Sequence, residues 1–123
     1  MRQIKIILGD LVVEAELGDS ETAKKVWTAL PVETSFNTWG DEIYFPIPVE
    51  AELDSEAHEV VQYGDLGYWP SGNAFCIFFG PTPISQGGEI RPASAVNIIG
   101  KVTGDAMNLK EGMAEELIRV EKV

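Results

Sequence analysis

Arg91 is the basic residue best placed to bind or act on a ligand. It is one of three arginines, and it stands directly before Pro92 within an irregular segment, residues 80–94. A guanidinium in such a segment can clamp a carboxylate or donate to an amide. It can equally pair with nearby Glu89 or stack on an aromatic ring. The sequence leaves both interpretations open.

Aromatic residues are the second feature that could bind a ligand. The stretch 64–83 has no Lys or Arg and reads as a buried strand between rigid aromatic turns. Such turns can wall a cleft or close the end of a barrel. Because neighbours on a strand face opposite sides, one residue of each pair, Tyr68/Trp69 and Phe78/Phe79, is expected to point away from the interior.

Other familiar chemistries are not indicated. His58 is the single histidine and Cys76 the single cysteine, so no zinc ligand set can be assembled from them. Cys76 lies in the apolar run AFCIFF, which is typical of a small buried hydrophobic residue. No serine lies in a G-x-S-x-G turn, and no glycine-rich loop carries the lysine of a phosphate site. We predict no metal and no cofactor.

Charge narrows the possible partners. The chain has 20 acidic and 9 basic residues and a net charge of −11. The negative electrostatic field of such a chain repels phosphate groups and anionic lipids, which disfavours nucleic acid and anionic membranes as partners. The acidic residues are scattered along the chain. Glu14 and Glu16 share one strand face. We interpret these two and the four acidic residues at 50–56 as solvated surface residues. The single cysteine and the absence of a membrane-length apolar stretch favour a cytoplasmic location.

The element pattern predicts one mostly β domain over residues 1–123. Residues 3–17 read as a hairpin turning at Gly9-Asp10, and a helix is expected from about Ser20 to Pro31. The rest reads as short strands, with an additional short helix near residues 105–113. Seven or eight strands without β-α-β alternation indicate a closed antiparallel barrel.

Three strings carry a family resemblance: SFNTWGDEIYF (35–45), GDLGYWPSGNAFCIFFGPTP (64–83) and RPASAVNIIGKV (91–102). With them the chain resembles the small prokaryotic cyclophilin-like family nearly from end to end. The resemblance implies a mostly β fold, a closed eight-stranded barrel with one or two helices capping its ends.

The resemblance to true peptidyl-prolyl isomerases is weaker. Those enzymes use an arginine to polarise the X-Pro amide beside an apolar proline pocket. Residues 86–89, QGGE, are similar to their Q-G-G-D string, but the strand before it, 73–79, has no basic residue. We interpret this match as accidental.

We therefore expect a binding domain with an aromatic-lined cleft for a peptide or small organic ligand. The expected binding residues are Trp39, Tyr44, Tyr68, Trp69, Phe78, Arg91 and Asn97. The alternative is a weak or atypical peptidyl-prolyl isomerase that uses Arg91. A protein partner is a third possibility, since barrel domains also serve as assembly modules.

Overall fold

The protein is described here by a computed structural model covering residues 2–123. The elements in chain order are β1 (Arg2–Leu8), β2 (Leu11–Leu17), α1 (Glu21–Ala29), β3 (Val32–Ser35), β4 (Asn37–Thr38), β5 (Glu42–Pro46), β6 (Ala57–His58), β7 (Asp65–Trp69), β8 (Ala74–Phe78), β9 (Val96–Val102), α2 (Leu109–Gly112) and β10 (Leu117–Lys122). Short 3₁₀ turns at Pro70–Gly72 and Ala106–Asn108 complete them. Within residues 2–123, neither α-helix has the length and apolar character needed to cross a membrane.

The strands form a nearly closed antiparallel barrel. Their order is β3-β10-β1-β2-β9-β7-β8-β5-β4, and β6 pairs with β9 outside this path. The two ends of the path, β3 and β4, are separated in sequence only by Phe36. The mostly β barrel is confirmed, but nine strands line the path instead of the expected eight. The reason is that segment 32–38 divides, pairing with β10 through β3 and with β5 through β4.

The predicted first hairpin is present. β1 and β2 pair without interruption from Arg2↔Leu17 to Leu8↔Leu11. Gly9 occupies the turn with φ +60°, a left-handed conformation that glycine adopts without a side-chain clash.

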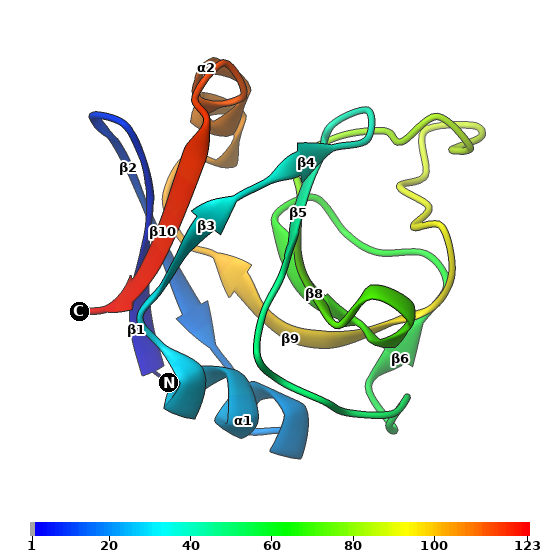
Figure 1. The fold of residues 1–123 in the computed structure, drawn as a ribbon. Helices are drawn as coiled ribbons and strands as arrows, with labels where there is room; N and C mark the ends of the chain where they lie inside the picture. The colour runs from blue at the N-terminus through cyan, green and yellow to red at the C-terminus, as the bar shows by residue number, and fades with distance from the viewer. Residues whose placement is uncertain (1) are drawn as a thin grey trace.

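The two helices lie at opposite ends of the barrel (Figure 1). Ser20 caps α1, because its side chain accepts a hydrogen bond of 3.1 Å from the Ala23 N–H. Trp27 on this helix packs partly against the core beside Lys122, whose Nζ lies 4.8 Å from the ring centroid.

Two apolar clusters occupy the two faces of the sheet formed by β5, β8, β7 and β9. The larger fills the barrel and includes Phe45 and Phe75, whose rings stack at 5.2 Å. The smaller, here the outer cluster, consists of Val61, Ala74, Cys76, Phe78, Ile90 and Val96, with Tyr44, Trp69 and Ile98 packed against it. Alternation along β8 divides these sets, so Phe75 and Cys76 face opposite sides.

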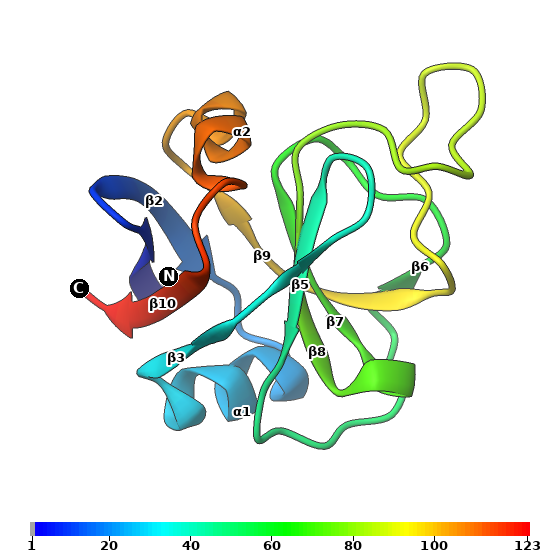
Figure 2. The ribbon, with the colours of Figure 1, turned by 45° about the horizontal axis from the view of Figure 1, so that its top comes forward.

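Residues 80–95, here the long loop, cover the outer cluster. In Figures 1 and 2 this yellow-green loop lies on the side of the molecule opposite β1, β2 and β10. Ile90 belongs to the outer cluster and forms an isolated bridge with Val61. The loop therefore contributes the apolar side chain of Ile90 to the packing of the fold.

A buried polar network joins β9 to α1 and to the segment before β6. Asn97 has no exposed surface; its amide donates to Thr22 Oγ1 at 3.1 Å and to the Glu52 carbonyl at 2.8 Å. Its oxygen accepts from the Asp54 N–H at 2.9 Å, and Thr22 donates to an Asp54 carboxylate oxygen at 2.8 Å. Every polar atom of the Asn97 side chain thus has a partner.

We expect Asn97→Ala to lower the free energy of unfolding by about 2–3 kcal/mol, because it leaves buried polar groups unpaired. Urea denaturation monitored by circular dichroism measures the loss. Asn108→Ala is the matched control, since Asn108 is exposed, and a change within about 0.5 kcal/mol is expected. Equal effects of the two substitutions would contradict a stabilising role for the network.

Candidate functional site

A pocket of about 270 Å³ opens on the outer face of the sheet, where the long loop leaves the outer cluster partly uncovered. Its lining residues are Trp39, Glu42, Tyr44, Trp69, Pro92, Ala93 and Val96. Larger hollows of about 420 and 730 Å³ lie over α1 and beside the β9 end of the barrel, and many of their lining residues are charged. The smaller pocket combines apolar walls with a buried carboxyl group, so we take it as the candidate site.

The β5 strand supplies two of the lining residues by simple alternation. Ile43 and Phe45 face the barrel core, so Glu42 and Tyr44 face outward. In the β5–β8 register Glu42 lies opposite Phe78 and Tyr44 lies opposite Cys76. This register places the Glu42 and Tyr44 side chains beside the outer cluster.

Two tryptophans complete the aromatic walls. Trp69, at the end of β7, meets Tyr44 edge to face, with ring centroids 6.3 Å apart and an interplanar angle of 83°. Trp39 lies in the turn between β4 and β5, where its backbone N–H donates to the Glu42 backbone carbonyl at 2.9 Å. Three aromatic side chains from separate points of the chain therefore reach one pocket.

The long loop forms the remaining wall and is held by its own hydrogen bonds. The Trp69 indole N–H donates to Ser94 Oγ at 2.6 Å, which ties the loop to β7. Ser85 Oγ accepts from the N–H groups of Thr82 and Arg91 at 2.9 and 3.0 Å, and the Thr82 hydroxyl donates to the Arg91 carbonyl. These contacts position Pro92, a pocket-lining residue, against the site.

Glu42 is the unusual member of the pocket. The residue is only 5% exposed, and within residues 2–123 no nitrogen or oxygen donates a hydrogen bond to its carboxylate. Burial raises the pKa of Glu42 to about 7, and a hydrogen bond from the Cys76 thiol partly opposes that rise. Cys76 Sγ also lies 3.8 Å from the Ala74 carbonyl oxygen, which is a second acceptor within reach of the thiol.

The consequence is a carboxyl group that changes protonation state close to neutral pH. As a carboxylate it accepts hydrogen bonds and pairs with cations; when protonated it can also donate. Shifted carboxyl groups in clefts are common at functional sites. Burial and the neighbouring Glu42 also raise the pKa of the Cys76 thiol, so this cysteine stays protonated. Among residues 2–123 no group of three or more His, Cys, Asp or Glu side chains is arranged to hold a metal ion.

The residues expected from the sequence are divided among different places. Trp39, Tyr44 and Trp69 line the pocket. Phe78 is fully buried within the outer cluster. Tyr68 belongs to the barrel core, and its hydroxyl donates to the Val49 carbonyl at 2.6 Å. Asn97 is held in the network with α1.

Arg91 pairs with Glu89, one of the alternatives that the sequence left open. Its Nε donates to one carboxylate oxygen of Glu89 at 2.6 Å and its Nη2 to the other at 3.2 Å. This guanidinium lowers the pKa of Glu89. The described pocket lining includes Pro92 and Ala93 but no arginine.

The sequence does not single out Glu42, which is one of 20 acidic residues scattered along the chain. The signal was present in the string DEIYF, because a residue two positions before Tyr44 shares its strand face. What the pattern did not show is that the long loop covers this outer face.

We expect Glu42→Gln to become more stable relative to the parent protein as the pH rises. Folding raises the pKa of Glu42 from 4.5 to about 7. The folded state therefore holds the proton more tightly than the unfolded state, and the stability that this gives is full below pH 4.5 and is lost as the pH rises to about 7. The free energy of unfolding of the variant, minus that of the parent, should increase by about 2 kcal/mol between pH 5 and pH 8. Urea denaturation at both pH values measures this difference.

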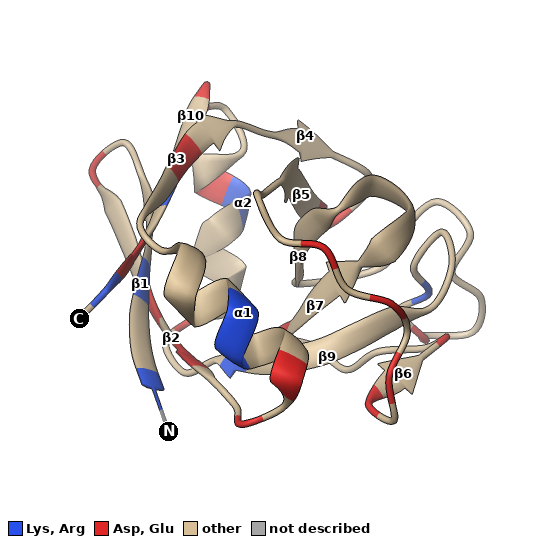
Figure 3. Ribbon diagram, turned by 60° about the horizontal axis from the view of Figure 1, so that its bottom comes forward, with Lys and Arg blue, Asp and Glu red and all other residues tan. Residues whose placement is uncertain are grey.

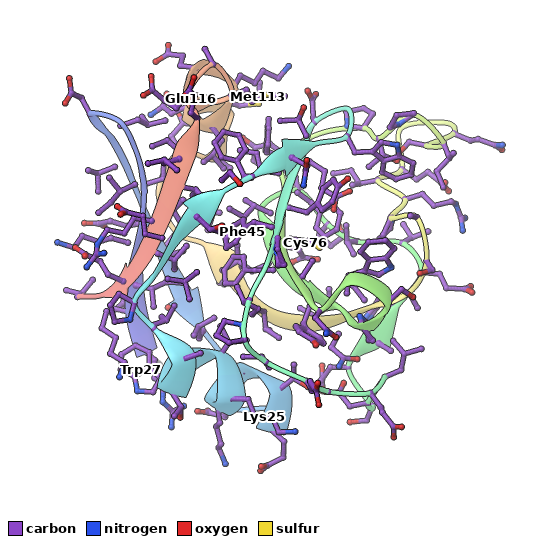
Figure 4. The ribbon with its side chains drawn as sticks, viewed as in Figure 1. Lys25, Trp27, Phe45, Cys76, Met113 and Glu116 are labelled. Atoms are coloured by element: carbon purple, nitrogen blue, oxygen red, sulfur yellow. The ribbon has the colours of Figure 1, made fainter. Side chains whose placement is uncertain are left out.

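Glu116→Gln is the charge-matched control, because Glu116 is exposed between α2 and β10 (Figure 4). Its difference from the parent should not change with pH over this range. Parallel behaviour of the two variants would show that Glu42 is not held near neutrality by the fold.

Solved structures with this fold include AF2241 and McbB. The hypothetical protein AF2241 from Archaeoglobus fulgidus is 39% identical with a TM-score of 0.81, over 99% of this chain and 95% of AF2241. McbB, solved in complex with tryptophan, is 19% identical with a TM-score of 0.74, over 96% of this chain and 44% of McbB. At that identity the likeness to McbB shows the fold alone.

Among curated proteins none matches the chain. Residues 2–121 match the family described as Cyclophilin-like. This match covers nearly the whole sequence and agrees with the barrel, and the chain therefore belongs to the cyclophilin-like family.

Proposed function

We propose that this protein is a binding domain whose pocket takes a small organic ligand or one side chain of a peptide. The observation that carries the proposal is the convergence of Trp39, Tyr44 and Trp69 around a cavity of about 270 Å³. Concave sites with apolar and aromatic walls and a few polar groups are the usual form of small-molecule sites.

The size of the pocket favours a ligand group with one ring system. Pockets that bind drug-sized ligands measure about 300–1,000 Å³. This cavity of about 270 Å³ is slightly smaller than that range. Aromatic walls contact such a ring by edge or face, and both arrangements are favourable. A longer peptide would place a single side chain in the pocket and its backbone outside.

Hydrogen bonds within the protein hold the walls of the pocket in place. Trp69 is hydrogen-bonded to Ser94, and the loop carrying Pro92 is braced by Ser85. A preformed site loses less conformational entropy on binding than a flexible one. The tryptophan complex of McbB, a protein of similar fold, further supports a small aromatic ligand, although no residue role transfers at 19% identity.

The isomerase alternative receives less support. It requires an arginine beside a proline-sized pocket, and Arg91 is engaged by Glu89 through two contacts. To reach a substrate amide in the pocket, its guanidinium would have to leave that pair. We therefore favour binding over catalysis.

Indole, a neutral single-ring-system probe, tests the proposal by NMR. The three tryptophans give separate indole N–H signals, and Trp27 lies in α1, away from the pocket (Figure 4). Titration with indole should shift the signals of Trp39 and Trp69 and leave Trp27 unchanged. Uniform small shifts, or shifts confined to Trp27, would contradict the site.

Trp39→Ala should weaken indole binding by about tenfold, because stacking on an aromatic side chain contributes on the order of 1 kcal/mol or more. Tyr63→Ala is the control, since Tyr63 is 52% exposed and lies outside the pocket lining. A parallel NMR exchange assay on X-Pro peptides addresses the alternative. Catalysed exchange that disappears in Arg91→Ala would establish an isomerase instead.

A further inference from the structure

We propose that the pocket selects organic cations, namely ligands with a ring or apolar body and an ammonium group, and that the Glu42 carboxylate binds the ammonium. This inference rests on the proposed function and names its ligand class. Three independent features of the site support it.

The first feature is a buried carboxyl group that has no cationic partner among the described residues. Glu42 lines the pocket, yet it is 95% buried and receives no hydrogen bond from any nitrogen or oxygen within residues 2–123. A buried carboxylate loses much of its hydration and is stabilised by a cation that donates N–H bonds. An ammonium supplies both the charge and the hydrogen bonds that the protein itself does not provide.

The second feature is the composition of the walls. The faces of Trp and Tyr rings attract cations through their quadrupoles, most strongly where water is excluded. Trp39, Tyr44 and Trp69 all line the cavity that contains Glu42. Walls of this kind favour the same ligand charge as the carboxylate does.

The third feature is the absence of a competing cation within the described pocket lining. Lys110 of α2 pairs with Asp41 at 3.4 Å, and Arg91 pairs with Glu89. The overall charge of −11, spread over strands, helices and loops, also attracts cations toward the protein (Figure 3).

Ligand binding should be coupled to the ionisation of Glu42. The titratable or charged groups on the elements around it are Tyr44 of β5, Cys76 of β8, the Asp41–Lys110 pair and the Glu89–Arg91 pair. Of these, the Cys76 thiol is the one that affects the pKa of Glu42. A cation binds the ionised form, so its affinity should rise with pH and level off above about pH 8.

Three indole compounds that differ in charge form the test: tryptamine, indole and indole-3-propionate. Tryptamine stays protonated across the range because alkylammonium groups titrate near pH 10. Calorimetry at pH 8 should show tryptamine binding at least about tenfold tighter than indole, and indole-3-propionate weaker than indole. At pH 5.5 the affinity for tryptamine should fall by more than about tenfold while that for indole stays constant.

Glu42→Gln should reduce the preference for tryptamine over indole to about twofold or less and remove its pH dependence. Glu116→Gln should retain both properties. Continued binding of indole by Glu42→Gln, seen as shifts of the Trp39 and Trp69 signals, shows that the pocket of the variant is intact.

The outcomes separate the two proposals. If indole binds but tryptamine has no advantage, or keeps its advantage in Glu42→Gln, the charge selection is overturned and the binding pocket stands. If none of the three compounds shifts the signals of Trp39 and Trp69, both proposals are overturned.

Discussion

The strand β8 has no face toward solvent, and the rest of the structure follows from that constraint. All five of its residues, Ala74–Phe78, are buried. A sheet that is apolar on both sides needs a cover on each: the barrel interior covers one side, and the long loop covers the other. The loop is therefore part of the fold, and the pocket is the place where its cover is incomplete. A continuous cover would leave a second core and no site.

The same constraint places a carboxyl group where water is scarce. The register of β5 on β8 sets Glu42 on the outer face, and a shift of one residue would exchange it with Ile43 of the barrel core. The position is thus specified by the hydrophobic pattern of its neighbours. Burying an ionisable group without a cationic partner is unfavourable for folding, and proteins accept such groups mainly where binding or chemistry uses them. For this reason Glu42 indicates a functional site more strongly than the exposed acidic residues do.

Local patterns in the sequence were sufficient to predict helices, strands and turns. They were not sufficient to predict what each face of a strand packs against. The hairpin around Gly9, the helix capped by Ser20 and the opposed directions of Phe78 and Phe79 were predicted, because each depends on neighbours in the chain. Strand alternation states only that one of these two residues points away from the interior; the structure shows that it is Phe78. Whether it then meets water, a ligand or a loop depends on residues 80–95, whose path is set by side-chain hydrogen bonds that no periodicity reveals. The role of Asn97 could not be predicted for the same reason, because its hydrogen-bond partners lie 43–75 positions away in the chain.

The long loop also determines the sign of the charge in the pocket. Arg91 is adjacent to the lining residue Pro92, and a free guanidinium there would be the natural partner for a buried carboxylate. Glu89, two positions earlier, engages it through both carboxylate oxygens at 2.6 and 3.2 Å. Both members of that pair are partly solvated, so its contribution to stability is small, but it satisfies the guanidinium within the loop. Proximity in sequence lets Glu89 meet Arg91 without any rearrangement of the barrel. Among the described residues that line the cavity, Glu42 is consequently the one with a charged side chain, and under the cation selection proposed above its counter-charge comes from the ligand.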